Sequence, residues 1–124
     1  MKGPTANETS STQGPLVLII EDHFTLLELE KCIFERAGYR VCGFGSGEEA
    51  LAAPSELLRE ARIALVDAVF GGLETIQALR KINPRIKTAI VTGRGFDPHP
   101  DIDMIVFLPF RHEELLHWVR ELLS

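Results

Sequence analysis

Three acidic side chains and one hydroxyl each follow a short aliphatic segment that reads as a strand. Glu21 and Asp22 come after LVLII, Asp67 comes after IALV, and Thr92 comes after TAIV. In an open sheet of parallel strands, ligands bind in the crevice beyond the carboxyl ends of the strands. If the three segments are neighbouring strands, these four side chains converge on one site. A buried strand gains no stability from ending in an acid, so a chemical role is the better interpretation of Asp67.

Carboxylates gathered in one crevice repel one another, and this repulsion raises the pKa of at least one of them. A divalent cation relieves the repulsion, and Mg²⁺ prefers a few hard oxygen ligands. Asp67 is then available as a nucleophile, because carboxylates form aspartyl-phosphate intermediates. Phosphoryl transfer depends mainly on positioning and charge neutralisation, to which a hydroxyl such as that of Thr92 contributes. The residue types therefore suit metal binding and phosphoryl transfer.

The elements that must position these side chains alternate between strand-like and helix-like patterns. Pro54 interrupts the second helix, and the stretch 93–104 has little helical pattern, which predicts one helical turn there or none. Leu26, Leu29, Ile33 and Ala37 indicate the buried stripe of the first helix, and Leu27 and Phe34 widen it. The alternation predicts a parallel sheet with helices on both faces. The predicted strands are 16–20, 39–44, 63–66, 88–91 and 105–108, and the predicted helices are 23–37, a broken one from 46, 73–82 and 111–123.

Length and charge bound the remaining interpretation. The 124 residues suit one domain over 16–124, preceded by a flexible tail over 1–15 that has almost nothing to bury. The net charge of −5, with Arg and Lys scattered along the chain, argues against nucleic-acid binding. No apolar run reaches membrane-spanning length, so we expect a cytoplasmic protein with no membrane contact. Cys32 and Cys42 are expected to be reduced, buried small hydrophobes.

Four segments in this order resemble a receiver domain of bacterial two-component signalling: LVLIIEDH, IALVDAVFGG, AIVTG and LPFRHEEL. The resemblance covers Leu16 to Leu123. It implies an α/β, flavodoxin-like, doubly wound fold, whose five-stranded parallel sheet has the order 2-1-3-4-5. The spacing after the acceptor strand and the short fourth connection look most like single-domain receivers. On this resemblance the chain is a signalling protein rather than an enzyme.

The resemblance also assigns roles to residues. Asp67 would be the phosphoacceptor, and Thr92 would contact the phosphoryl group. Mg²⁺ would be held by Glu21, Asp22 and Asp67, together with the backbone carbonyl of Val69. The phosphoryl donor would be a sensor histidine kinase or a histidine phosphotransfer protein.

Two positions depart from the receiver pattern. Most receivers carry a lysine directly before the proline that closes the fifth strand, where this chain has Leu108, and the usual aromatic residue of that strand is replaced by Ile105. Two interpretations follow. Either Asp67 is still phosphorylated, with Mg²⁺ and Arg94 compensating for the lysine, or the chain is a degenerate receiver that acts as a phosphorylation-independent interaction or dimerisation module.

Rival functions have weaker support. A phosphatase using Asp67 as nucleophile needs a second acid two residues later, where this chain has Val69. A flavodoxin-like nucleotide binder needs a glycine-rich loop after the first strand, and EDHFTLLEL provides none. A homodimer is a further expectation, because a short fourth connection leaves the fifth strand less covered.

Overall fold

The computed structural model describes residues 14–69 and 71–124. The flexible tail expected over residues 1–15 lies outside the described residues, except for its last two. Gly14 and Pro15 both contact Arg40: the Arg40 side chain donates a 2.7 Å hydrogen bond to the carbonyl of Gly14, and its backbone N–H donates a 3.0 Å hydrogen bond to Pro15. The described chain therefore begins tied to the second strand.

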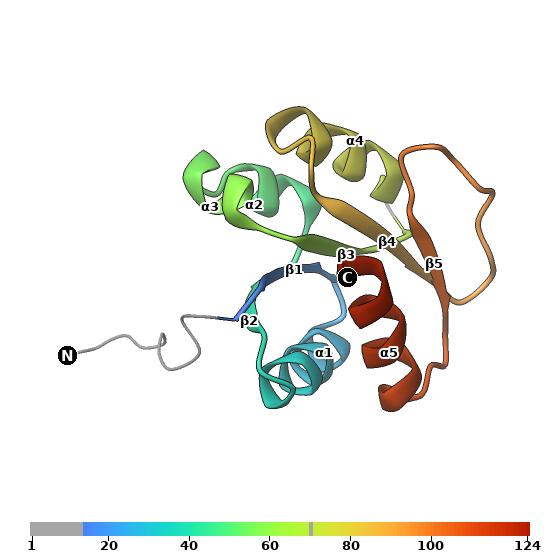
Figure 1. Ribbon diagram of the computed structural model, residues 1–124. Helices are drawn as coiled ribbons and strands as arrows, with labels where there is room; N and C mark the ends of the chain where they lie inside the picture. The colour runs from blue at the N-terminus through green and yellow to red at the C-terminus, as the bar shows by residue number, and fades with distance from the viewer. Residues whose placement is uncertain (1–13, 70) are drawn as a thin grey trace.

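A five-stranded parallel sheet forms the centre of the molecule (Figure 1), with the order β2-β1-β3-β4-β5. This confirms the predicted α/β fold class and strand order. Its strands are β1 (Leu16–Ile20), β2 (Arg40–Phe44), β3 (Ile63–Asp67), β4 (Lys87–Thr92) and β5 (Met104–Phe107).

Helices cover both faces of the sheet. One face carries α1 (Phe24–Arg36) and α5 (His112–Leu123), and the other carries α2 (Gly47–Leu51), α3 (Ser55–Glu60) and α4 (Gly72–Ile82). Pro54 separates α2 from α3, as expected, because its ring cannot continue a helix. Among the described residues, no helix is both long enough and apolar enough to span a membrane.

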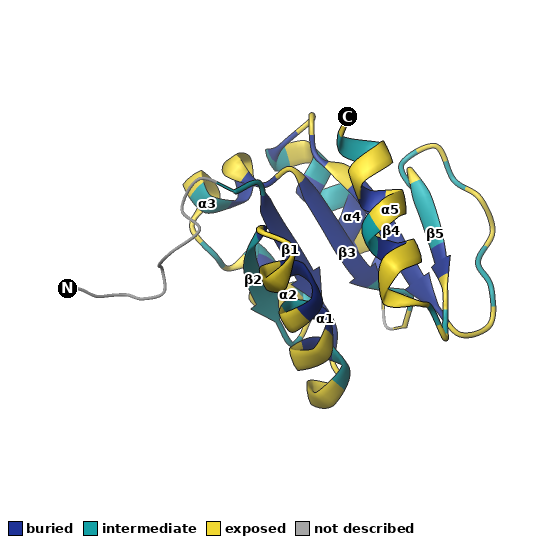
Figure 2. Cartoon of the chain, turned by 60° about the horizontal axis from the view of Figure 1, so that its bottom comes forward, coloured by how far each residue is buried: buried dark blue, intermediate teal, exposed yellow. Residues whose placement is uncertain are grey.

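The core lies in two layers, one on each face of the sheet (Figure 2). Strand β1 is buried along its whole length and alternates between the layers. Leu18 and Ile20 belong to the layer under α2, α3 and α4, whereas Val17 and Ile19 belong to the layer under α1 and α5. A fully buried central strand explains its continuous aliphatic sequence.

The connection between β4 and β5 contains no helix, which confirms the expectation for this stretch. Polar contacts hold it instead. The Thr88 hydroxyl donates a 2.6 Å hydrogen bond to the Asp101 carbonyl, and the Asp103 carboxylate accepts a 2.9 Å hydrogen bond from the Thr88 backbone. Arg80 of α4 lies 3.3 Å from the same Asp103 carboxylate. The connection is thus fixed to β4 and α4 without a helix of its own.

Two expectations about burial were wrong. Helix α1 buries Leu27, Glu30, Ile33 and Phe34, while Leu29 is 42% exposed. Leu27 and Phe34, which were expected only to widen the stripe, are thus at its centre, and Phe34 packs fully into the layer under α1 and α5. Cys32 is exposed, and Cys42 on edge strand β2 is only half-buried.

Candidate functional site

Three carboxylates meet at the carboxyl end of the sheet. Glu21, Asp22 and Asp67 each offer an oxygen, and these oxygens all lie within 4.8 Å of one another. Strands β1 and β3 are adjacent and in register, with Ile20 opposite Val66, so the residues that follow them come together. The structure therefore brings together the three acids that the sequence placed at strand ends.

Burial makes this acidic cluster electrostatically costly. Glu21 is only 4% exposed, and burial raises its pKa to about 7, with the negative charge of Asp67 raising it further. The backbone N–H of His23 opposes this by donating a 3.0 Å hydrogen bond to the Glu21 carboxylate. Burial likewise raises the pKa of Asp67, and Asp22 adds to the effect. A cation at this site would remove the repulsion.

The donor set suits a hard divalent cation. Carboxylate oxygens are the ligands that Mg²⁺ prefers, and it retains several waters when few carboxylates bind it. A cavity of about 90 Å³ opens beside Asp22 and Asp67, with Val69 and Thr75 on its wall. Its volume admits only small groups, such as a hydrated ion or a phosphoryl group.

The loop after Asp67 is held close to this acid. The backbone N–H of Val69 donates a 3.2 Å hydrogen bond to an Asp67 carboxylate oxygen, and this bond lowers the pKa that burial raises. The Val69 side chain is exposed at the mouth of the cavity. The loop backbone therefore contacts the Asp67 carboxylate directly, while the Val69 side chain is exposed.

Thr92 ends the neighbouring strand β4, but its hydroxyl is engaged within its own loop. It donates a 3.2 Å hydrogen bond to the Gly95 carbonyl and accepts one of the same length from the Arg94 backbone. Thr92 is buried and does not line the cavity beside Asp67. The Arg94 side chain is exposed. The structure thus places Thr92 at the expected strand end, with its oxygen directed to the following turn.

Two glycines explain how helices approach the acids so closely. A methyl group on Gly72 would lie 2.5 Å from the Asp67 carbonyl oxygen, so α4 begins in direct contact with the end of β3. A methyl group on Gly47 would lie 2.1 Å from the Thr75 hydroxyl, which draws α2 against α4 beside the cavity. Gly71 adopts a φ of +84°, which side chains disfavour. The Gly71-Gly72 pair therefore shapes the site.

A fourth acid lies below the cluster, and the sequence analysis missed it. Glu30 of α1 is only 1% exposed, and its Oε2 atom has no hydrogen-bond partner within the described part of the chain. Burial raises its pKa to about 8, and the charges of Glu21 and Asp67 raise it further. The spacing Leu27–Glu30–Phe34 could have revealed it, because these residues share one helix face.

Leu108 lies at the position where most receivers carry a lysine. It closes β5 with a 2.8 Å hydrogen bond from its backbone N–H to the Thr92 carbonyl, and its half-buried side chain packs on the layer under α1 and α5. An apolar side chain therefore occupies this position on the face of the sheet that also buries Glu30.

No family model and no curated protein matches the chain. Solved structures do match. A CheY-like response regulator receiver domain protein from Methanospirillum hungatei aligns with a TM-score of 0.74 and 24% identity, over 89% of this chain and 94% of that one. The response regulator TrrA from Thermotoga maritima, solved with Mg²⁺ and BeF, aligns with a TM-score of 0.75 and 24% identity, over 88% and 99%.

The chemotaxis protein CheY4 from Vibrio cholerae gives a similar result, with a TM-score of 0.73 and 20% identity over 87% of this chain and 98% of that one. These neighbours define the class: the chain has the flavodoxin-like fold of response regulator receiver domains. The fold and its resemblance to receivers agree with the interpretation drawn from the strand-end acids.

Proposed function

We propose that this chain is a single-domain receiver that accepts a phosphoryl group on Asp67 in a Mg²⁺-dependent phosphorelay. The observation that carries the proposal is the meeting of the Glu21, Asp22 and Asp67 carboxylates within 4.8 Å at the carboxyl end of the sheet. The donor is a sensor histidine kinase or a histidine phosphotransfer protein, and the setting is the cytoplasm.

Glu21, Asp22 and Asp67, with the Val69 carbonyl, would hold the cation. Bound Mg²⁺ supplies positive charge for the phosphoryl oxygens. An Asp67 carboxylate oxygen attacks phosphorus, so that a P–O bond forms while the P–N bond to the donor imidazole breaks. The imidazole nitrogen keeps the electron pair and takes up a proton from solvent. Asp67 must be ionised to attack, and the cation favours this form by opposing the pKa increase that burial causes.

Thr92 would donate its hydroxyl hydrogen to the transferred phosphoryl group. This requires the hydroxyl to leave its hydrogen bond with Gly95. The exchange links modification of Asp67 to the turn after β4. The protein acts as a stoichiometric switch rather than as an enzyme, because Val69 provides no acid or base for turnover.

The test is to incubate the protein with acetyl phosphate, with and without Mg²⁺, and to measure intact mass. We expect one phosphoryl adduct that requires Mg²⁺ and is lost in Asp67→Asn. The matched control is Asp97→Asn, an exposed acid in the β4–β5 connection, which should keep the adduct. An adduct that survives in Asp67→Asn, or none in the wild type with either acetyl phosphate or a histidine phosphotransfer donor, would contradict the proposal.

A specific observation favours a second candidate. Leu108 stands where the receiver pattern has a lysine, and the buried Glu30 adds an acid on the same face, so neither residue supplies a cation to Asp67. A degenerate receiver would act by protein contact alone, including contact with a second copy. For such a protein we expect no adduct and no change in amide NMR shifts on adding beryllofluoride with Mg²⁺.

A further inference from the structure

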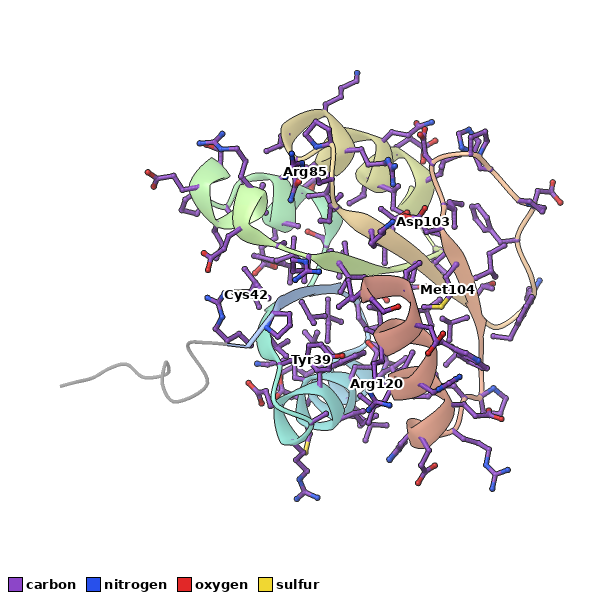
Figure 3. All side chains as sticks on the ribbon, viewed as in Figure 1. Tyr39, Cys42, Arg85, Asp103, Met104 and Arg120 are labelled. Carbon is purple, nitrogen blue, oxygen red and sulfur yellow. The ribbon has the colours of Figure 1, made fainter. Side chains whose placement is uncertain are left out.

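A second cavity lies at the opposite end of the sheet from the acidic cluster. It encloses about 550 Å³ near the amino ends of β3 and β4 and the last turn of α5. Four cationic residues contribute to its wall: Arg59, Arg62, Arg85 and Lys87. Arg85, labelled in Figure 3, lies in the connection between α4 and β4. In a chain of net charge −5, a cavity with four cations stands out against the rest of the molecule.

These cations have no carboxylate partners in residues 14–69 and 71–124. None of the four takes part in a salt bridge there. Glu60 also lines the cavity, but its carboxylate lies 2.6 Å from the Arg40 guanidinium. The four cations therefore form no ion pair within the described part of the chain, while Glu60 and Ser124 lie in the same wall.

The walls of this basic cavity are held in place by buried hydrogen bonds. The buried Asn83 side chain donates 2.9 Å hydrogen bonds to the carbonyls of Leu58 and Ala61. Its oxygen accepts a 3.2 Å hydrogen bond from the Arg85 backbone. The segments that carry the cations are thus fixed relative to one another before any ligand binds, and a preformed site loses less entropy on binding.

The far wall is apolar, and it includes the carboxyl end of helix α5, which has a partial negative charge. Leu122 and Leu123 line it, and the carboxyl end of α5 opposes an anion there. The Arg62 guanidinium lies 3.3 Å from the Leu123 carbonyl and offsets part of this charge. A ligand that places anionic groups near Arg59, Arg85 and Lys87 and an apolar part near the leucines would match both walls.

The shape of the cavity favours a small ligand over a macromolecule. The cations surround a concave space within the 300–1,000 Å³ range of small-molecule sites, instead of forming an extended stripe. Guanidinium groups bind phosphate oxygens in paired hydrogen bonds, and several of them favour a ligand with several charges. We propose that this basic cavity binds a small organic anion that carries at least two phosphate groups and an apolar ring. The proposal does not depend on phosphorylation of Asp67.

The test is calorimetric titration of the full chain with ADP, pyrophosphate and inorganic phosphate, without Mg²⁺. We expect saturable binding with the highest affinity for ADP, a lower affinity for pyrophosphate and the lowest for phosphate. Amide NMR shifts should change only for residues around the basic cavity. Arg85→Ala and Lys87→Ala should each weaken ADP binding at least tenfold. Arg120→Ala removes an exposed cation of α5 that does not line the cavity, and it should change ADP binding less than twofold.

Several results would overturn the proposal: no saturable binding of any probe, equal binding in the cavity variants, or shifts centred on Asp67. Binding of duplex DNA or anionic vesicles, lost in Lys87→Ala while ADP does not bind, would assign the surface to a macromolecule instead. Both variant sites are exposed, so circular dichroism should show unchanged folding. If one variant unfolds, Arg59→Ala replaces it.

Discussion

The two ends of the same pair of strands carry opposite charges. At the carboxyl ends, Asp67 on β3 lies against Glu21 and Asp22. At the amino ends, Lys87 begins β4 beside Arg62, and its backbone N–H donates a 3.0 Å hydrogen bond to the Arg62 carbonyl. The cavity at the acidic end has a volume of about 90 Å³, and the cavity at the basic end has a volume of about 550 Å³. Like charges gather at each end, so we expect each end to be stabilised by a ligand of opposite charge that would not suit the other.

Asn83→Ala is expected to have the largest effect, because it should break the basic end while leaving the acidic end intact. The substitution removes the side-chain hydrogen bonds to the Leu58 and Ala61 carbonyls. The Leu58 carbonyl keeps a 3.3 Å hydrogen bond from the Ala61 backbone, whereas the Ala61 carbonyl loses its donor, and an unsatisfied buried group costs about 1–3 kcal/mol. We expect a loss of about 3 kcal/mol in the free energy of unfolding, measured by urea denaturation. Gln77→Ala, which removes one half-buried side-chain hydrogen bond, should cost much less.

Glu30→Met should increase the free energy of unfolding by removing a buried acid near the acidic end. It replaces an unpartnered buried acid with an apolar side chain of similar length, for which we expect a gain of about 2 kcal/mol at pH 8. The folded-state pKa of Glu30, about 8, is above its unfolded value of about 4.5, so the folded protein binds more protons between these values. Wild-type stability should therefore fall as pH rises from 4.5 to 8.

Denaturation at several pH values checks this prediction. The methionine variant should have a shallower decline in the free energy of unfolding than the wild type, with a remaining slope from Glu21, whose pKa is also raised. Glu28→Met, an exposed acid on the same helix, serves as the control and should leave the slope unchanged. An identical slope in Glu30→Met and wild type would show that Glu30 is not protonated in the folded state.

Mg²⁺ should stabilise the fold by binding at the acidic end and not at the basic end, with a smaller effect on the free energy of unfolding than the two substitutions above. At a free concentration ten times its dissociation constant, it should stabilise the fold by about 1.4 kcal/mol, seen as a higher melting temperature. Asp22→Asn should abolish this increase, because it removes one of the three clustered carboxylates. Arg85→Ala at the basic end should retain it. A Mg²⁺ response that persists in Asp22→Asn would place the ion elsewhere.

Arg94→Ala tests whether an exposed arginine replaces the missing lysine. Its side chain is exposed, so the free energy of unfolding should change by less than about 0.5 kcal/mol. Beryllofluoride binding with Mg²⁺, followed by NMR, should nevertheless weaken severalfold if the guanidinium reaches the phosphoryl position. Unchanged binding would assign no compensating role to Arg94.

The sequence was sufficient for the fold and for the acidic cluster, for the same reason. Aliphatic runs that alternate with helical patterns predict a parallel sheet, and residues that directly follow adjacent parallel strands must meet. Glu21, Asp22 and Asp67 obey this rule. The turn of Thr92 toward Gly95 depends on the conformation of a short loop, which no spacing rule specifies.

Glu30 and the basic cavity were missed for a different reason. Glu30 is a charged residue on the buried face of an amphipathic helix, and pattern reading assigns charges to the exposed face. The four cations of the basic cavity come from helix α3, from two connections and from the start of β4, so the sequence shows only scattered charges. They gather because α3, β3, α4 and β4 begin or end at one edge, which is a property of the assembled sheet.

The contact at Gly72 has a mechanical consequence. A side-chain carbon on Gly72 would clash with the Asp67 carbonyl oxygen, so the start of α4 lies in direct contact with the end of β3. The far half of α4 reaches the helix-free connection before β5 through Arg80 and Asp103. Helix α4 thus touches the Asp67 backbone at its first residue and the β4–β5 connection near its last turn, so we expect a displacement of Asp67 to be felt at both contacts.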